Sequence, residues 1–471
     1  MWESFIIAFN NYYDFIATAS AGDVYIRLFK DFGWIILMWM SLKMFWEAYI
    51  LNRIGLYLGA LKWVFLAIDI PKGNEQTPKA VEQIFAHLAG GLKNPDLEEA
   101  FLDGYMQPWF SFEIVSIEGY IQFIIRSVTK YRDMVESAIY AQYPEAEITE
   151  IEDYAKDFPS HFPNKEYNLW GTEFSLVRNG NGEECYPIKT YPEFEHTSAE
   201  EVFKDPMAAI LETLTRIGKG EFCGIQILIK PIDENWNHWK KNGRNMVKDL
   251  IGAPIQESQS LLSKAGGLPG KFLDETFTAV HGAPMGPGAA EEEPMDWMKS
   301  KMLYLSPGER GVVEKIEEKM AKICYACKIR YIYLAKKEIY DRSKISYGLH
   351  GAFRQFGTEN MNGLKPDFKT IGTHVHYFFT EERDNWRRNR LISAYKWRSR
   401  WRGLNEFLLN TEELASIWHF PMLTVKTPLL AQTEARRGKP PASLPTERSV
   451  DTIKAIERRE KGAPPPNLPT I

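Results

Sequence analysis

The feature that most constrains this chain is an apolar run at Phe32–Leu51, FGWIILMWMSLKMFWEAYIL. Only Gly33, Ser41, Lys43 and Glu47 interrupt it, and its length matches the roughly 20 residues of a bilayer-spanning helix. A lysine near midspan costs about 2.5–3.5 kcal/mol, which offsets most of what about six apolar residues contribute. Lys43 and Glu47 are four residues apart and can pair on one helical face. We expect a membrane anchor, spanning or interfacial; the alternative is a buried amphipathic core helix.

The anchor should stay in the mature chain, because the run begins too late for a cleavable leader and lacks a basic stretch before it. Only four cysteines occur, too few for a disulfide framework, which favours a reducing compartment. We therefore expect a cell-membrane protein whose main body is cytoplasmic. The residues predicted to lie in the membrane are Phe32, Trp34, Ile35, Ile36, Leu37, Trp39, Leu42, Phe45, Trp46 and Leu51.

Composition predicts that much of the chain folds. It has 471 residues, 44% hydrophobic and 25% charged, which excludes a wholly disordered, collagen-like or polytopic membrane protein. With 57 Lys and Arg residues against 62 Asp and Glu residues, the net charge is −5. A surface that is basic everywhere is excluded, so any contact with nucleic acid must be local.

After the anchor, the pattern predicts a first α+β module. Thr77 can cap a helix that begins at Pro78 and ends at Gly90-Gly91. Two apolar runs follow, separated by Glu118-Gly119, which is a hairpin signal. A helix stopped by Pro144 and a short strand complete a ββαβ order. The two hairpin strands and the last strand are predicted at Phe112–Ile117, Tyr120–Ile125 and Glu147–Ile151.

A similar order recurs downstream. Strands are predicted at Trp170–Val177, Tyr186–Thr190 and Phe222–Pro231, with a helix opening at Asp205-Pro206. Two ferredoxin-like modules would account for this repeat of pattern.

The remaining chain predicts a Gly- and Pro-rich linker, a third mixed module and a Pro-rich tail. The third module should hold helices near Arg310–Lys322, Ile345–Phe356 and Glu381–Arg402 and a strand at Cys324–Ala335. The predicted fold class is α+β. Its divisions are a membrane anchor region at 1–65, α+β modules at 66–160 and 161–263, the linker at 264–300, the third module at 301–426 and the tail at 427–471.

No catalytic motif is evident. The Gly-Lys dipeptides at Gly218, Gly270 and Gly438 lack both the Ser or Thr that should follow and the glycine that should precede them in a phosphate-binding loop. We expect a protein that is not an enzyme and nominate no catalytic residue and no cofactor.

Two short patterns resemble metal sites without completing one. Cys324 and Cys327 have ligand-like spacing but should point to opposite faces of a strand, and no second pair follows at the usual distance. His374 and His376 would lie on one side of a strand, but the sequence places no third ligand beside them. We predict no metal site.

The segment Arg383–Arg402, RDNWRRNRLISAYKWRSRWR, interleaves cations with aromatic rings. Such a surface suits a phosphate backbone or anionic lipid headgroups. The alternative is a solvated helix whose aromatic side chains pack inward and whose arginines pair with nearby acids. The residues predicted to make contact are Arg387, Arg388, Arg390, Lys396, Trp397, Arg398, Arg400 and Trp401.

Four segments carry a family resemblance: Leu66–Gly90, Phe112–Tyr154, Tyr167–Phe174 and Leu409–Pro421. Together with the closing TVKTPLLAQTEARRGKPPASLP, they resemble the amino-terminal, membrane-anchored region of type IV secretion-like conjugative DNA-transfer proteins of small-genome bacteria. In that family this region leads into a P-loop ATPase, for which this chain has no motif.

The resemblance implies a non-enzymatic accessory component of a DNA or protein translocation machine. Its expected partners are the membrane and a separately encoded P-loop ATPase or other translocase subunits. A second copy of the chain and DNA are further partners that this role would allow.

Overall fold

The computed structural model describes residues 12, 13, 15, 18–71, 74–180, 182–194, 205–233, 236–252, 305–375 and 377–422. The predicted linker at 264–300 and the predicted Pro-rich tail at 427–471 lie outside these residues. The chain divides into two compact units. The helical unit is Met1–Lys62 with Lys93–Pro108, and the sheet unit is Trp63–Leu92 with Trp109–Ile471.

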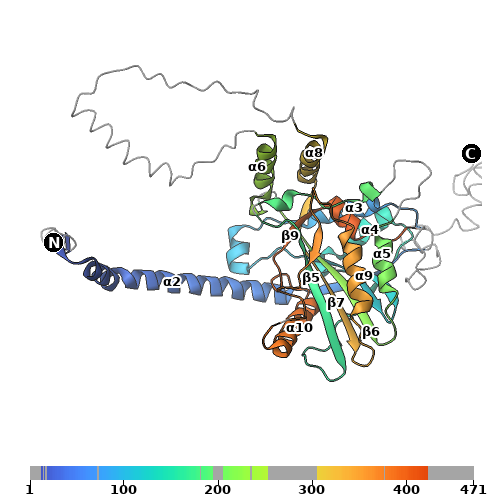
Figure 1. Ribbon diagram of the computed structural model, residues 1–471, viewed down its shortest axis with the longest axis horizontal. Helices are drawn as coiled ribbons and strands as arrows, with labels where there is room; N and C mark the ends of the chain where they lie inside the picture. The colour runs from blue at the N-terminus through green and yellow to red at the C-terminus, as the bar shows by residue number, and fades with distance from the viewer. Residues whose placement is uncertain are drawn as a thin grey trace, which may run out of the picture. The chain divides into compact units, whose positions relative to one another are not determined.

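The helical unit contains a 40-residue helix, α2 (Ala21–Ala60), drawn in blue in Figure 1. Ser20 caps it by accepting a hydrogen bond from the backbone N–H of Asp23. Its stretch Gly33–Ala60 is long and apolar enough to cross a membrane, and none of the apolar window is buried. The predicted apolar helix is confirmed, as is the pairing of Lys43 with Glu47, whose charged groups are 3.8 Å apart.

In the sheet unit, the described residues form one nine-stranded antiparallel sheet. The strand order is β4-β1-β3-β2-β6-β7-β5-β8, and β9 pairs with β7. The bounds are β1 (Trp63–Asp69), β2 (Phe110–Ile117), β3 (Tyr120–Val128), β4 (Glu147–Ile151), β5 (Tyr167–Leu176), β6 (Glu221–Pro231), β7 (Cys324–Lys336), β8 (Leu364–Pro366) and β9 (Phe407–Asn410).

The two faces of the sheet are covered differently. Successive strand residues point to opposite faces, so Ile114 joins the main apolar core while Val115 joins a second, smaller cluster. Five helices contribute to the main core; in Figure 1, α5 and α9 lie together beside β6 and β7. They are α3 (Pro78–Leu88), α4 (Arg132–Gln142), α5 (Met207–Leu214), α9 (Ser343–Arg354) and α11 (Thr411–Ile417).

The second face is covered by α10 (Thr380–Lys396), whose Leu391, Ile392 and Tyr395 pack into the smaller cluster. Two further helices, α6 (Trp239–Ile251) and α8 (Pro307–Ala321), pack on each other in a separate apolar cluster. The fold is therefore mixed α and β, with an antiparallel sheet and an apolar N-terminal helix.

One order of elements occurs twice in the sheet. The sequences β1-α3-β2-β3-α4-β4 and β5-α5-β6-β7-α9-β8 both run strand, helix, two strands, helix, strand. Read from the outer edge of the sheet inward, the four strands of each unit lie in the order fourth, first, third, second. The two units join at the centre, where β2 pairs with β6. The observed repeat has six elements where the sequence predicted the four-element order ββαβ. In the chain, α6 and α8 come between β6 and β7 of the second unit.

Several local predictions are confirmed. The helix begins at Pro78, the hairpin turns at Glu118-Gly119 and the fourth strand is Glu147–Ile151. Glu118 and Gly119 have φ angles of 52° and 93°, as a tight two-residue hairpin turn requires.

Other predictions are corrected by long-range pairing. Tyr186–Thr190 forms no strand, because its backbone bonds elsewhere: the N–H of Ile188 donates to the Glu413 carboxylate at 2.8 Å. The basic helix ends at Lys396 rather than Arg402. Strand β7, from the predicted third module at 301–426, lies between β6 and β5, from the predicted second module at 161–263, so the two stretches share one sheet.

Trp418 tests the packing of the main core. Its fully buried ring contacts the rings of Phe85, Phe112, Phe123 and Phe420. Trp418→Ala should lower the free energy of unfolding by about 3–5 kcal/mol, because it leaves a cavity. Urea unfolding of the full chain in detergent, followed by circular dichroism, measures this change. Tyr347→Ala at an 80% exposed position should change it by less than about 0.5 kcal/mol, and equal effects would contradict the packing described.

Candidate interaction surface

A row of buried polar residues crosses the α10-facing side of the sheet. Glu113 of β2 lies opposite Gln226 of β6, Gln226 lies opposite Arg330 of β7, and Arg330 lies opposite Glu173 of β5. All four side chains are buried. Each stands at an alternating position of its strand, so all four point to the same face. We call these four residues the polar row.

The polar row is internally bonded. Gln226 Nε2 donates to Glu113 Oε1 at 3.0 Å, and Arg330 Nη2 lies 3.1 Å from Glu173 Oε1. The Tyr154 hydroxyl donates to the other Glu113 oxygen at 2.5 Å. The Arg330–Glu173 contact pairs two buried charges, as burial of charge requires, while Glu173 Oε1, Gln226 Oε1 and Arg330 Nε have no hydrogen-bond partner among the described residues.

The polar row also fixes the chain that follows α10, residues 397–404. Arg398 Nε donates to Glu113 Oε1 at 3.1 Å, and Arg330 Nη2 donates to the carbonyl of Ser399 at 2.5 Å. The backbone N–H of Leu404 donates to Glu173 Oε2 at 2.6 Å. Three residues of the polar row, Glu113, Arg330 and Glu173, therefore bind this segment to the sheet.

Lys328 of β7 adds a further attachment. Its ammonium donates to the carbonyls of Arg400 and Arg402 at 2.5 and 2.9 Å. Burial lowers the pKa of Lys328 to about 8. Lys328 thus binds the loop that follows α10, while Arg330 Nη1 donates to the carbonyl of Ala394 in the last turn of α10, where a cation is favourable.

The structure corrects the role predicted for two arginines. Arg398 is 1% exposed and pairs with Glu113 and with Asp153, the latter at 2.6 Å. Arg400 is buried and pairs with Glu406, whose Oε2 lies 2.6 Å from Arg400 Nη2. Neither guanidinium is open to an external ligand. Although burial disfavours the charged form of Arg398, Glu113 raises its pKa above the usual value.

Three other predicted cations are engaged by the protein itself. Arg387 donates to the carbonyl of Gly372 at 2.8 Å, and Lys396 donates to the carbonyl of Phe158 at 2.8 Å. Arg388 donates to the side chain of Asn385 at 3.2 Å. All three are half-buried, so they contribute charge but few free donors.

The residues that remain exposed are mostly aromatic. Trp397 is 74% exposed, Trp386 58% and Trp401 54%, and the Arg390 guanidinium lies 5.4 Å from the ring of Trp386. A groove of about 530 Å³ runs beside α10. It is lined by Ser160, His161, Trp386, Asn389, Arg390, Ser393, Lys396, Trp397 and Arg402. We call this groove with Trp401 the tryptophan surface.

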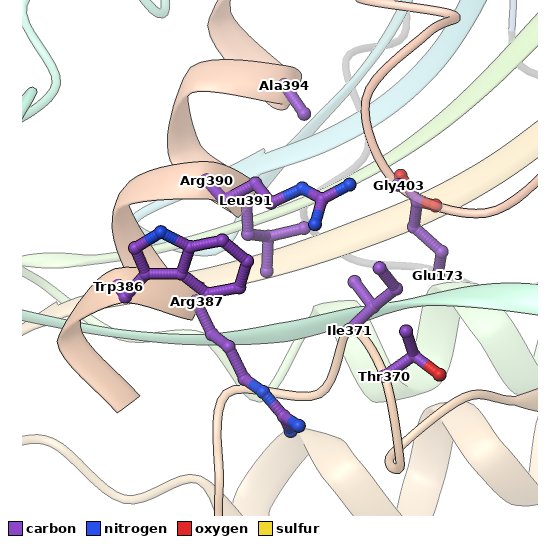
Figure 2. Close-up of a pocket in the computed structure, with 9 residues that line it drawn as sticks. All are labelled: Glu173, Thr370, Ile371, Trp386, Arg387, Arg390, Leu391, Ala394 and Gly403. Carbon is purple, nitrogen blue, oxygen red and sulfur yellow. The ribbon is translucent and has the colours of Figure 1, made fainter. Parts of the chain in front are cut away.

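A small cavity lies under α10, between the helix and the sheet. Figure 2 shows the Glu173 carboxylate directed to Gly403 while Arg387 points away from it. Its volume of about 10 Å³ holds one water at most. Gly403 has a φ of 101°, and a Cβ there would overlap the Glu173 carboxylate, so this close approach requires glycine.

Two further tryptophan rings, those of Trp109 and Trp63, follow one another behind the ring of Trp401. The Trp401 ring lies 5.5 Å from that of Trp109, and Trp109 lies 5.1 Å from Trp63. The Arg126 guanidinium stacks 3.6 Å from the Trp63 ring, and its Nε and Nη1 have no hydrogen-bond partner among the described residues. Burial, together with repulsion from Arg398, lowers the pKa of Arg126 to about 9.

The described residues contain no group of three or more His, Cys, Asp and Glu side chains arranged to hold a metal ion. Cys324 and Cys327 are free and buried in different apolar clusters, as expected for opposite faces of a strand. His374 Nδ1 lies 3.8 Å from Asp384 Oδ2. His376, its predicted companion, lies outside the described residues.

The polar row was not predicted. Its signal is a Glu, Gln or Arg within each of four mainly apolar strands: Glu113 in FEIVSI, Gln226 in GIQILI, Arg330 in KIRYIYL and Glu173 in WGTEFSL. Such isolated charges in buried strands should be paired, since unpaired ones are very costly.

Glu113 tests the polar row. Glu113→Ala would leave the buried Arg398 without its main carboxylate, so the free energy of unfolding should fall by about 3–5 kcal/mol. Glu150→Ala is the matched control because Glu150 pairs with Arg132 at an exposed site, where the loss should be at most about 1 kcal/mol. Chemical unfolding of both variants measures the difference. Similar losses would show that the row is not a buried ionic network.

No curated protein matches the sequence. A family model described as "Domain of unknown function (DUF8128)" matches residues 70–433. The match begins directly after β1 and includes the polar row and the tryptophan surface, whereas α2 lies outside it. Because the match extends over well more than half of its residues, the chain belongs to the DUF8128 family.

Proposed function

We propose that this protein is a non-enzymatic, membrane-anchored accessory component of a type IV secretion- or conjugation-like translocation machine. In this proposal α2 holds the protein in the cell membrane, and the sheet unit lies in the cytoplasm and docks a separate P-loop ATPase. The observation that carries the proposal is α2, an apolar helix with no buried residue in its apolar window.

The exposure of α2 supports anchoring. Trp34, Ile36 and Trp39 are each more than half exposed, as is Leu37. A soluble protein rarely leaves a contiguous apolar surface of this size open to water. Lipid would cover these side chains, which point to all sides of the helix.

Docking is supported by the tryptophan surface. Tryptophan and arginine dominate the binding energy of protein interfaces, and rigid side chains lose less entropy on binding. Trp397 and Trp401 belong to a segment fixed by the polar row and by Lys328. The choice of a P-loop ATPase as the partner rests on the family resemblance carried by Leu66–Gly90, Phe112–Tyr154, Tyr167–Phe174 and Leu409–Pro421.

We also propose that the two six-element units are ferredoxin-like modules. Their order of elements and their strand order support this assignment, since the split βαβ arrangement has the same succession.

Nucleic acid is a second candidate ligand, favoured by the groove. Trp386 and Trp397 offer rings for stacking bases, while Arg390, Lys396 and Arg402 line the same groove with positive charge. These groove residues do not include Arg398 and Arg400, which belong to the eight residues predicted to make contact but are buried.

Docking can be tested by cross-linking in native membranes. The full chain should recover a P-loop ATPase, and Trp397→Ala with Trp401→Ala should reduce recovery by about thirtyfold or more, since one hot-spot tryptophan contributes about 2 kcal/mol or more. Tyr347→Ala, which removes an exposed ring from α9, is the control and should not change recovery. Recovery of neither an ATPase nor a second copy of the chain would refute the docking role.

Nucleic-acid binding has a distinct signature. Arg390→Ala with Arg402→Ala should lower the affinity for single-stranded DNA and reduce the slope of log affinity against log salt by about 1.4, at about 0.7 per phosphate contact. Arg216→Ala with Arg310→Ala removes two exposed arginines outside the groove and should leave the slope unchanged. Fluorescence anisotropy over a salt series gives both slopes, and identical slopes would exclude this ligand.

A further inference from the structure

The surface of α2 changes near Trp46. Every residue from Trp34 to Phe45 is exposed, so no other described segment packs against this part of the helix. From Tyr49 onward, one side of the helix is half-buried, with two such residues in each turn. They are Tyr49, Ile50, Arg53, Ile54, Tyr57 and Leu58.

A second segment of the helical unit packs along this part of α2. It is Lys93–Pro108, which contains a π-helical turn, η2 (Glu99–Asp103), and which we call the ledge. The ring of Phe101 lies 5.7 Å from that of Trp46, and the ring of Tyr105 lies 5.4 Å from that of Tyr57. The ledge therefore contacts α2 over about three helical turns.

The contact is close at its centre. Arg53 Nε donates to the carbonyl of Leu102 at 2.5 Å. Gly104 has a φ of 69°, and a Cβ at this position would overlap the backbone of Arg53. Both the backbone conformation and the short approach require glycine, so the ledge lies directly on the helix.

The ledge cannot enter the hydrocarbon of a bilayer. It carries four carboxylates, at Asp96, Glu98, Glu99 and Asp103, against the single Lys93. Most of its backbone is irregular, and unsatisfied backbone groups are not tolerated where they face lipid. The part of α2 that it covers must also lie outside the hydrocarbon.

We infer that the ledge rests at the level of the lipid headgroups and ends the membrane-embedded part of α2 at about Trp46. This inference rests on the proposed anchoring by α2. It places the exposed side chains of Leu97, Phe101 and Leu102 in the interfacial zone, where apolar side chains beside charges are accommodated. Trp46 and Tyr49 lie at the same level, which is the usual depth of the aromatic belt.

The assignment removes the difficulty of a lysine at midspan. Lys43 lies three residues before Trp46, about 4.5 Å along the helix axis, and can reach the headgroups with its long side chain. Its partner Glu47 lies just beyond Trp46. The cost of about 2.5–3.5 kcal/mol for a lysine at the bilayer centre therefore does not apply.

The part of α2 that this inference places in the membrane is short. Phe32–Phe45 extends about 21 Å at 1.5 Å per residue, against a hydrocarbon thickness of about 30 Å. Arg27 and Lys30 lie on the amino-terminal side and can reach outward in the same way as Lys43. The remaining mismatch would thin the bilayer locally.

Cysteine labelling of the full chain in liposomes tests this depth. The four native cysteines of the protein are buried, so a membrane-impermeant maleimide reports on introduced positions. Leu37→Cys and Met40→Cys should react about tenfold or more slowly, because the reactive thiolate is excluded from hydrocarbon. Ala48→Cys and Leu51→Cys should react nearly as fast as the reference Tyr347→Cys on α9.

A second measurement examines the ledge itself. A fluorophore on Leu97→Cys should be quenched by a quencher attached to lipid headgroups and little affected by one deep in the acyl chains. The reference label on Tyr347→Cys should respond to neither. Gly104→Val should release the ledge from Arg53, and labelling at Ala48→Cys should then slow because α2 can sink further.

The outcomes separate the two proposals. If Ala48→Cys and Leu51→Cys are protected like Met40→Cys, or if the Leu97 label is unaffected by headgroup quenchers, the ledge inference is overturned while the anchor stands. If Leu37→Cys and Met40→Cys react as fast as the reference and the protein does not float with liposomes, the anchor itself fails.

Discussion

The sheet unit depends on charges buried where its two six-element halves meet. Glu113 and Gln226 face each other across the β2–β6 pair, which is the seam between the halves. Arg330 and Glu173 continue the row into the second half. Because side chains alternate along a strand, a slip of one residue at the seam would turn these groups into the apolar core. The row therefore selects one register for the whole sheet.

The polar row also determines which side chains are exposed on the segment that follows α10. Glu113, Arg330 and Glu173 each bond to the segment that follows α10, and that segment carries Trp397 and Trp401. Arg398, with a φ of 48°, turns its guanidinium inward to Glu113 while the neighbouring Trp397 stays exposed. A buried ionic network thus holds large apolar rings at the surface, an arrangement that ordinary apolar packing would oppose.

Elements set by local chemistry could be predicted from the sequence, and those set by distant partners could not. The helix from Pro78 and the hairpin at Glu118-Gly119 depend on residues within a few positions, so their signals were sufficient. Arg390 and Arg398 belong to one basic run, but Arg398 is buried by its pairing with Glu113, 285 residues away, and with Asp153. The position of β7 between β6 and β5 likewise has no local signal, since it depends on which strands meet.

The apolar run of α2 likewise has properties that its sequence predicts and others that depend on contacts with a distant segment. Counting residues treats Leu51 and Leu37 alike, because both are leucines in a long hydrophobic helix. Both side chains are more than half exposed, but a segment with four carboxylates packs along α2 between Trp46 and Tyr57, the stretch that contains Leu51, whereas no other described segment packs along the stretch that contains Leu37. A helix face cannot meet both lipid chains and ionised carboxylates, so the length of an apolar run sets only an upper limit on its embedded part.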